Sequence, residues 1–532
     1  MVITMEQEMV KYYSVKENYN FKFYKSIIMK KIFLVFSILL FAFSIKAQTL
    51  PSFVKDSLDN YVNNALTQWR IPGVAVCIVK DGKVVLMKGY GVKEVGGADK
   101  VDENTLFMIG SNTKAFTATV LAMLDAEKKL SLDDKAIKWL PEFKMKDAWV
   151  TKEVTVRDLL CHRLGMYTFQ GDFMFFDTDL STQEVLNKFS RLTPYYSFRS
   201  TWGYTNTAFL AGGLIAGNAT KSTWQDLVRT KIFQPLGMTR SLALSSEIIA
   251  ATNKAAAHSI MNDQLIKIPY GQLDNIAPAG SISSSVNDMS KWVTMQLDNG
   301  KFDGKTIVPA SAIQQTRTPN SILGDGRVPF NTGHFNLYGL GWFLQEYGGK
   351  KIVSHTGGVN GFVTSVTLIP EEKLGIIVLT NTDANSFYEA LKWEIMDAYF
   401  NFPYRNYSKL YHDAYERNNK AEAAVIQKQR DSIAMKLPIV LPLQKFTGEY
   451  ENDPYGTLNI QPEGDHLRIK FQHHIMTGKL EPLSGNRFLC TYSNPIWGTE
   501  PTVFTIENNQ VKSVTIKVAG FVDYMPYEFK KK

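Results

Sequence analysis

The chain has 532 residues, and this length predicts two or three folded units rather than a single core. With 45% hydrophobic and 21% charged residues it has the composition of a globular protein, which excludes a disordered or fibrous chain. Residues 1–47 hold seven lysines against three glutamates and so carry +4 of the net charge of +8. The remainder is only mildly basic and shows no zinc-finger spacing or phosphate-cradling loop, so nucleic-acid binding is disfavoured.

The first pattern along the chain is a targeting segment. Residues 29–48, MKKIFLVFSILLFAFSIKAQ, combine a dibasic start, an apolar run and a small residue before a polar one. They predict a signal peptide cut after Ala47 and an exported protein, periplasmic or secreted. The alternative is an uncleaved membrane anchor, but the apolar run is shorter than the ~20 residues that a spanning helix needs. The pattern also favours Met29 over Met1 as the true start.

A single α+β unit is predicted for residues 48–402. A helical pattern at 52–70 precedes two β-rich runs joined by Asp81-Gly82, which is a strong hairpin signal. A helix-rich middle follows, and strand character returns between 337 and 381. Strands at both ends that enclose helices predict an antiparallel sheet flanked by helices, in which the first and last strands pair.

The last part of the chain changes character twice. Residues 403–438 predict a polar helical linker, ended by prolines. Short β-rich runs with turn residues between them then predict a small all-β barrel or sandwich over 439–532, an accessory domain without its own nucleophile. Its His473-His474 pair points to opposite faces of a strand, so no metal site is expected there.

The stretch GSNTKAFTATVLAML places Ser111 at a predicted strand-to-helix turn, with Lys114 three residues later. At a helix N-terminus, unpaired N–H groups favour developing negative charge, and a lysine with a lowered pKa can deprotonate a serine. The alternative is an N-cap serine beside a surface lysine, although a cation in the first turn opposes the helix dipole. A second Ser-x-x-Lys match begins at Ser52, near the predicted cleavage site, and is interpreted as solvated surface.

Two further segments supply the groups that such a serine requires. In WGYTNTAF, Tyr204 is predicted to accept and return a proton if cations lower its pKa, and Asn206 to donate to Lys114 and to a substrate carbonyl. The alternative is a packed tyrosine and a turn asparagine.

The other segment is SHTGGVNGF. His355 ends a strand-like run, Thr356 offers a hydroxyl, and Gly357 lets a substrate approach the backbone closely. The backbone N–H groups of Ser111 and Gly358 are predicted to form an oxyanion hole. The alternative is a glycine-rich turn with an ordinary histidine.

The motifs SNTK, YTN and HTG, in this order, resemble the three signature elements of the serine β-lactamase and penicillin-binding protein superfamily. The Tyr-x-Asn form is similar to the class C β-lactamase and D-alanyl-D-alanine carboxypeptidase branch. HTG, where class C enzymes carry lysine, is similar to certain carboxypeptidases and D-aminopeptidases. VTVRDLLCHRLGM, PAGSISSSVNDMSKW, YGLGWF and LGIIVLTN also resemble that branch, and the tail resembles an appended lipocalin-like domain.

The resemblance implies an exported serine hydrolase that forms an acyl-enzyme on a peptide or amide containing D-amino acids. It implies that Ser111 is the nucleophile, Lys114 its base, Tyr204 the proton relay, Asn206 a substrate donor, and His355 with Thr356 the binder of the substrate's carboxylate side. No cofactor, metal or nucleic-acid partner is implied. The alternatives are a promiscuous esterase, a weak β-lactamase, or a protein that binds cell-wall peptides without turnover.

Overall fold

The computed structural model describes residues 8–9, 50–261, 263–324 and 333–532, so the predicted signal peptide lies outside the described residues. The chain divides into the units Met1–Lys55 and Asp56–Lys532, and the second carries the central sheet, the barrel and Ser111. In the described ranges, no helix is both long enough and apolar enough to cross a membrane.

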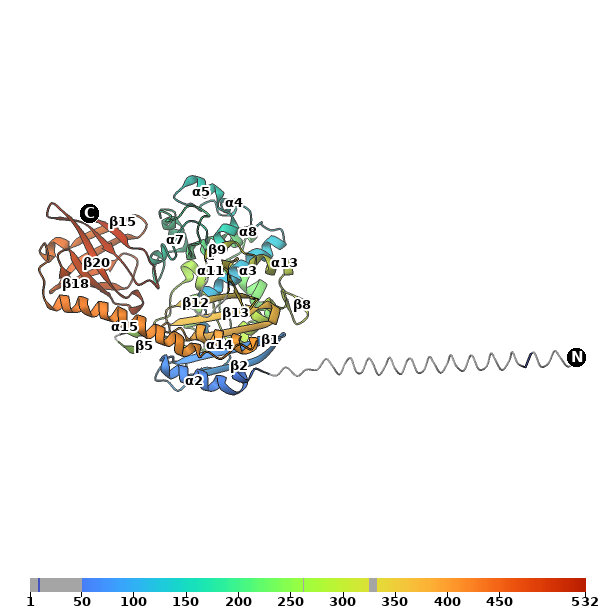
Figure 1. The fold of residues 1–532 in the computed structure, drawn as a ribbon. Coiled ribbons are helices and arrows are strands. Elements are labelled where there is room, and N and C mark those ends of the chain that lie inside the picture. The colour runs from blue at the N-terminus through green and yellow to red at the C-terminus, as the bar shows by residue number, and fades with distance from the viewer. Residues whose placement is uncertain (1–7, 10–49, 262, 325–332) are drawn as a thin grey trace. The chain divides into compact units, whose positions relative to one another are not determined.

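The centre of the second unit is an eight-stranded antiparallel sheet (Figure 1). In spatial order its strands are β2 (Lys83–Gly91), β1 (Gly73–Lys80), β14 (Leu374–Thr380), β13 (Phe362–Ile369), β12 (Lys350–Val359), β11 (Phe343–Tyr347), β10 (Asn336–Tyr338) and β9 (Ser321–Gly324). Asp81 and Gly82 form the first hairpin with φ angles of 51° and 74°, as the two-residue turn requires. The first strand pairs with the last, Val74 with Thr380, as predicted.

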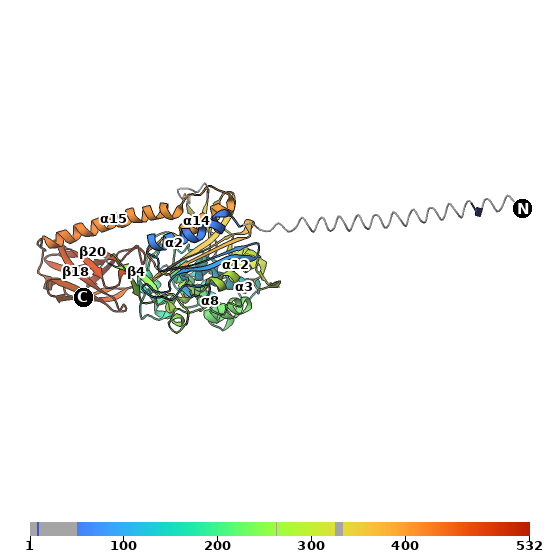
Figure 2. The same ribbon diagram turned by 90° about the horizontal axis from the view of Figure 1, so that it is seen from below.

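Helices cover both faces of this sheet, which explains why its central strands β1, β13 and β14 are buried along almost their whole length rather than at alternate residues. On one face lie α2 (Leu58–Gln68) and α14 (Phe387–Phe400), and on the other lie α12 (Val286–Leu297) and α3 (Thr113–Ala126) (Figure 2). The predicted α+β class with a helix-flanked antiparallel sheet is therefore confirmed.

The helix-rich middle of the chain packs beside α3 and carries Tyr204 and Asn206. Its helices include α4 (Ala136–Trp139), α5 (Ala148–Glu153), α6 (Val156–Leu160), α7 (Thr182–Phe189), α8 (Asn206–Thr220), α9 (Trp224–Val228), α10 (Gln234–Leu236), α11 (Ala277–Gly280) and α13 (Ala310–Thr316). Three two-stranded ribbons complete it: β3 (Phe107–Met108) with β6 (Ser283–Ser284), β4 (Ala257–Met261) with β5 (Gln264–Ile268), and β7 (Lys301–Phe302) with β8 (Lys305–Thr306).

The C-terminal part is a long polar helix, α15 (Tyr407–Ala434), followed by a closed barrel, which confirms the predicted all-β domain. The barrel strands are β15 (Gly448–Asn452), β16 (Gly456–Glu463), β17 (His466–Phe471), β18 (Thr477–Ser484), β19 (Arg487–Tyr492), β20 (Thr499–Glu507), β21 (Gln510–Ile516) and β22 (Tyr527–Lys531). Each strand pairs with the next, and β22 returns to β15.

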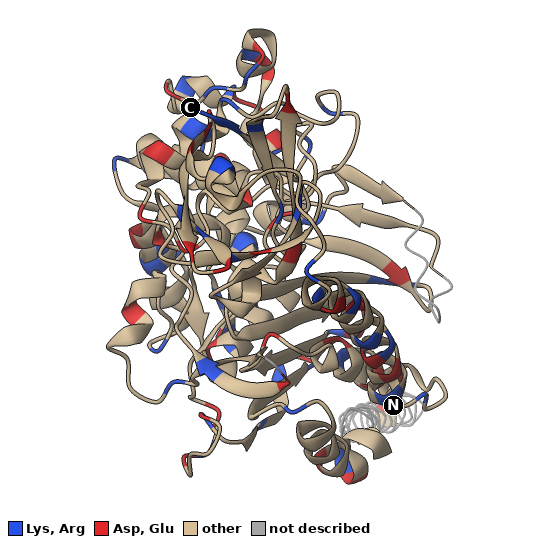
Figure 3. Ribbon diagram, turned by 90° about the vertical axis from the view of Figure 1, so that its left-hand side faces the viewer, with Lys and Arg blue, Asp and Glu red and all other residues tan. Residues whose placement is uncertain are grey.

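Charged residues of both signs are interspersed over the described part of the chain (Figure 3). This distribution agrees with the mild net charge and with the absence of a basic stripe from the sequence.

Candidate active site

The turn that carries Ser111 is fixed by a glycine before it. Strand β3 leads through Gly110, at φ 51°, into the short helix η2 (Gly110–Asn112) and then into α3. A Cβ atom on Gly110 would lie 2.9 Å from the backbone nitrogen of Gly358, so only glycine allows this close approach. The turn therefore holds Ser111, which is partly exposed, directly against the Gly358 segment of β12.

The Lys114 ammonium is buried and has three acceptors. Its Nζ lies 3.0 Å from Ser111 Oγ, 2.6 Å from Asn206 Oδ1 and 2.8 Å from the carbonyl oxygen of Ala279. Burial lowers the pKa of Lys114 well below its ordinary value, and the nearby Asp172 carboxyl opposes this only in part. Lys114 can therefore reach the neutral state that a general base needs.

These contacts also set the direction in which a neutral Lys114 accepts a proton. A neutral amine has two N–H groups and one lone pair. Asn206 Oδ1 and the Ala279 carbonyl can only accept, so they hold the two N–H groups. The lone pair is then left for the hydroxyl of Ser111, which is the arrangement required to deprotonate a serine nucleophile.

Tyr204 and Asn206 approach from the start of α8, as predicted, but two expected details need correction. Tyr204 is hydrogen-bonded to Ser111, yet burial raises its pKa above the ordinary value, so the expectation of a lowered pKa is wrong. The hydroxyl therefore stays protonated. Asn206 accepts from Lys114 rather than donating to it, and its Nδ2 donates to Asp172 Oδ2 at 2.5 Å.

His355 belongs to a buried chain of hydrogen bonds with a fixed direction. His162 Nδ1 accepts from the backbone N–H of Thr205 at 3.0 Å, so its Nε2 carries the proton and donates to the Tyr338 hydroxyl at 3.3 Å. Tyr338 then donates to His355 Nε2 at 3.0 Å, and His355 Nδ1 donates to the carbonyl of Thr356 at 2.6 Å. The chain links the Tyr204–Asn206 segment to β12.

The predicted role of His355 in binding a carboxylate is corrected by this arrangement. The imidazole is buried and both ring nitrogens are engaged. Burial, followed by the charge of Lys114, lowers the pKa of His355 to about 3, so the ring is neutral. His355 is thus held within the strand, and Thr356, which is partly exposed, is the more accessible member of this pair.

The edge of β12 beside Ser111 is open. Strand β11 pairs with β12 only as far as Ser354, and Gly358 further along is exposed. A Cβ atom on Gly357 would lie 1.8 Å from the carbonyl oxygen of Ile109, so only glycine lets β12 pass this close to the nucleophile turn. This edge can pair with the backbone of an extended peptide, with the N–H groups of Ser111 and Gly358 near the reacting carbonyl.

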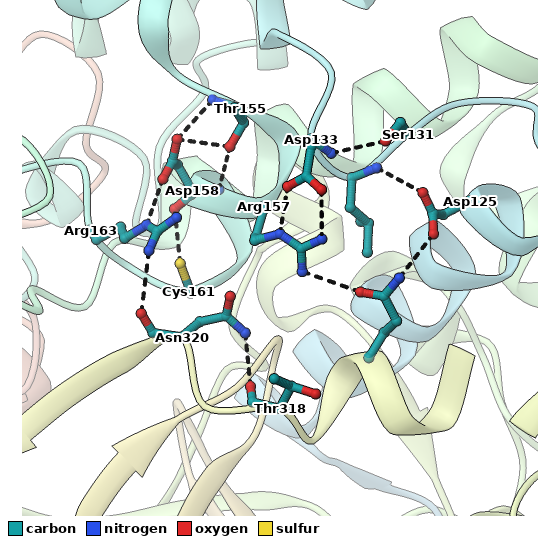
Figure 4. A network of polar contacts seen from close by, with 12 residues as sticks. Asp125, Ser131, Asp133, Thr155, Arg157, Asp158, Cys161, Arg163, Thr318 and Asn320 are labelled. Atoms are coloured by element: carbon teal, nitrogen blue, oxygen red, sulfur yellow. Dashed lines mark hydrogen bonds and ion pairs between the residues drawn. The ribbon is translucent and has the colours of Figure 1, made fainter. Parts of the chain in front are cut away.

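The VTVRDLLCHRLGM segment, which contains His162, carries a buried carboxylate, Asp158, that bonds to Thr155 and Arg163 (Figure 4). Asp158 forms a capping box with Thr155 at the start of α6 and also pairs with Arg163 and Arg199, at 2.5 and 2.6 Å. Burial acts to raise the pKa of Asp158, but the hydrogen bonds from Arg199 and Thr155 outweigh it and hold that pKa below its ordinary value. The network fixes the end of α6, from which His162 follows.

A loop of the barrel, residues 517–526, reaches the same site. Gly171, the residue before Asp172, donates its backbone N–H to Asp523 Oδ2 at 2.9 Å. Phe521 lies against Gly358, and the ring of Tyr524 stacks on Phe169 with centroids 5.5 Å apart.

The hydrolase-side turn η3 (Asp172–Met174) in return inserts Phe173 among barrel rings. The ring of Phe173 stacks on His474 and Tyr527, with centroids 4.5 and 5.2 Å apart, and meets Trp497 edge-on. Beside this contact, a cavity of about 490 Å³ is lined by both domains, including Asp177, Asn360 and His473.

Sequence reasoning missed Asp172, Tyr338 and Asp523. Tyr338 begins the YGLGWF stretch, whose resemblance to the family was the available signal. Asp172 begins the short turn η3 and Asp523 lies in a barrel loop. Neither segment has a readable sequence pattern, and only the tertiary structure brings the two carboxyls to the site. In the described ranges, no group of three or more metal-ligating side chains is found, and the three cysteines are free and buried.

Comparison with known proteins agrees with this geometry. The Beta-lactamase family model matches residues 58–400, and a domain of unknown function, DUF3471, matches residues 436–531. The chain is 30% identical over 423 residues to unguisins hydrolase ungD' of Aspergillus campestris, covering 75% of this chain and 76% of that protein. It is 27% identical over 340 residues to protein flp of Staphylococcus aureus, covering 62% of this chain and 64% of that one.

Among solved structures, the fold is similar to that of the octameric penicillin-binding protein homologue from Pyrococcus abyssi. The TM-score is 0.58 at 22% identity, and the match covers 89% of this chain and 99% of that one. The family match spans most of the chain, and it covers the turn, helix and strand that hold Ser111, Lys114 and Gly358. The chain therefore belongs to the beta-lactamase family of serine hydrolases.

Proposed function

We propose that the chain hydrolyses amide bonds of short peptides through an acyl-enzyme on Ser111. The observation that carries this proposal is the buried Lys114, whose Nζ lies 3.0 Å from Ser111 Oγ. Fixed acceptors hold the two N–H groups of the neutral amine, so its lone pair is directed at Ser111. Lys114 takes the proton of Ser111 as Oγ bonds to the substrate carbonyl carbon, and the oxyanion accepts from the N–H groups of Ser111 and Gly358.

Collapse of the tetrahedral intermediate breaks the C–N bond. Tyr204 donates its proton to the leaving nitrogen and is reprotonated from Lys114, so the amine departs neutral. Water then adds to the acyl carbon by the reverse sequence, in which Lys114 removes a proton from water and returns it to Ser111 Oγ. The products are a free carboxylic acid and the regenerated serine.

The substrate is proposed to be a peptide containing D-amino acids and to carry no carboxylate at His355. The open edge of β12 supports an extended peptide backbone, and one relative is named for the hydrolysis of unguisins. The neutral, fully engaged His355 offers no charge to a terminal carboxylate, which favours an aminopeptidase or amidase over a carboxypeptidase. A short-chain ester, which likewise has no terminal carboxylate to bind, is the second candidate substrate.

The deciding experiment labels the intact protein with a fluorophosphonate and locates the adduct by peptide mass spectrometry. We expect one adduct, on Ser111, that is lost in Ser111→Ala and kept in Ser52→Ala, the matched variant in the other Ser-x-x-Lys match. An adduct that persists in Ser111→Ala contradicts the proposal. Comparing kcat/KM for D-aminoacyl amides, D-Ala-D-Ala peptides, nitrocefin and p-nitrophenyl esters then ranks the substrate classes.

We also infer that the protein is exported. The pattern of residues 29–48 supports this inference. Export predicts that the mature protein begins at Gln48, which intact mass measurement of the protein purified from its native host checks. A mature protein that retains residues 29–47 contradicts cleavage.

A further inference from the structure

Two carboxyl groups that the proposed chemistry does not use lie behind Asn206, one from each domain. Asp172 accepts from Asn206 Nδ2 at 2.5 Å, and Asp523 of the barrel loop accepts from the backbone N–H of Gly171 at 2.9 Å. Both carboxyl side chains are buried, Asp523 fully and Asp172 almost so. A continuous chain of contacts thus runs from the barrel to the nucleophile.

Asp172 decides which way the Asn206 amide points. Asp172 Oδ2 accepts from the Nδ2 end of the amide, and this hydrogen bond turns the Oδ1 end toward Lys114. If the amide were reversed, an NH₂ group would face the Lys114 amine, and the acceptor that orients the Lys114 lone pair toward Ser111 would be lost. The second hydrogen of Nδ2 remains available for a substrate carbonyl.

Asp523 binds the backbone of the turn that carries Asp172. Its two oxygens accept from the backbone N–H groups of Gly171 and Met525, at 2.9 Å each, so it ties the turn before Asp172 to the barrel loop. Gly171 has a φ of 93°, which places this turn in a conformation that favours glycine. The position of Asp172 therefore depends on the docked barrel.

We propose that Asp172 is a positioning residue for the Asn206–Lys114 pair, and that Asp523 of the barrel holds Asp172 in place, so that docking of the barrel completes the catalytic geometry. This inference rests on the proposed function, because it assigns to Asp172 the orientation of the proposed base. The accessory domain is then a part of the active site rather than an appendage to it.

The charge of Asp523 affects the pKa of Asp172, and the charge of Asp172 affects the pKa of Lys114. Burial, followed by the charge of Asp523, raises the pKa of Asp172 well above its ordinary value, and burial raises the pKa of Asp523 to about 7. An ionised Asp172 would in turn raise the pKa of Lys114. The titratable and charged groups that face Asp172 are Lys114, Tyr204, Tyr455, Asp523 and Tyr527.

The test compares pH profiles of kcat/KM for p-nitrophenyl butyrate in the full-length wild type, Asp172→Asn and Asp523→Asn. The matched control is Asp453→Asn, which removes an exposed ion pair with Arg191 across the same domain contact. In Asp172→Asn the amide is no longer oriented, so we expect kcat to fall about 100-fold while KM stays within about threefold.

In Asp523→Asn we expect the acid limb of the kcat/KM profile to shift to higher pH. Without the Asp523 charge, Asp172 ionises at lower pH, its carboxylate raises the pKa of Lys114, and the acid limb moves up by roughly one pH unit. Asp453→Asn is expected to follow the wild type.

Two outcomes overturn the inference: kcat of a folded Asp172→Asn within about threefold of the wild type, or acid limbs that coincide in Asp523→Asn and Asp453→Asn. If Asp172→Asn does not fold, the acid limb of the nearly isosteric Asp523→Asn decides alone. A wild type that is not labelled by fluorophosphonate at Ser111 would instead refute the proposed function, so the two failures are distinguishable.

Discussion

Phe173 is a buried aromatic side chain at the contact between the hydrolase domain and the barrel. It is 1% exposed, and it stacks on or meets the rings of His474, Trp497 and Tyr527 in the barrel. A phenylalanine side chain buries about 150–250 Å². At ~25 cal/mol per Å² this burial is worth about 4–6 kcal/mol, and substitutions of buried phenylalanine by alanine cost about 3–5 kcal/mol. We therefore expect Phe173→Ala to lower the free energy of unfolding by about 3–5 kcal/mol.

Urea unfolding followed by tryptophan fluorescence measures this loss, because the ring centroid of Trp497 lies 5.4 Å from that of Phe173. The matched control is Phe335→Ala, the same substitution at a side chain that is 62% exposed, which is expected to cost under about 0.5 kcal/mol. A loss below about 1 kcal/mol in Phe173→Ala, or one equal to that of the control, would refute the reasoning.

Three further predictions concern the surroundings of Ser111. Tyr338→Phe removes the hydroxyl that donates to His355, so we expect a loss of about 1–3 kcal/mol in thermal or urea unfolding, and an unchanged stability would contradict the chain of hydrogen bonds. Gly357→Ala brings a Cβ atom against the nucleophile turn, and the rate of fluorophosphonate labelling is expected to fall on the order of 100-fold; a rate near wild type would mean that β12 can shift. Asp158→Asn leaves two arginines without their carboxylate and is expected to cost about 3–5 kcal/mol at neutral pH. Because the folded-state pKa of Asp158 is lowered, its contribution is full above the unfolded pKa of about 4 and is lost as pH falls through the folded pKa, so the variant should lack that acid slope in unfolding curves.

Much of the fold follows from local sequence patterns. The Asp81-Gly82 turn, the strands at both ends of the first domain and the short β-rich runs after 439 are each encoded within a few residues, and the structure has them as predicted. The meeting of the SNTK, YTN and HTG segments at one place was predicted from the resemblance, and the structure brings Ser111, Lys114 and Asn206 within hydrogen-bond distance.

The protonation states of the site residues depend on burial, which cannot be read from a sequence motif. The sequence shows that a histidine stands at 355, but its neutral state comes from burial and from the charge of Lys114, which lower its pKa. In the same way, the raised pKa of Tyr204 is mainly an effect of burial. The carboxyls of Asp172 and Asp523 lie 351 positions apart in the chain (523 − 172 = 351), and no periodicity links two loops across such a separation.

The insertion of Phe173 into the barrel has a consequence for synthesis of the chain. Its ring partner Tyr527 is 354 positions later (527 − 173 = 354), so the ribosome makes the covering surface well after Phe173. At a synthesis rate of about 5–20 residues per second, Tyr527 is made on the order of 20–70 seconds after Phe173. During that interval the first domain exposes an aromatic side chain and lacks the Asp523 contact to the turn before Asp172. The nascent hydrolase is therefore expected to need protection from aggregation, and to gain full activity only after strand β22 has been made.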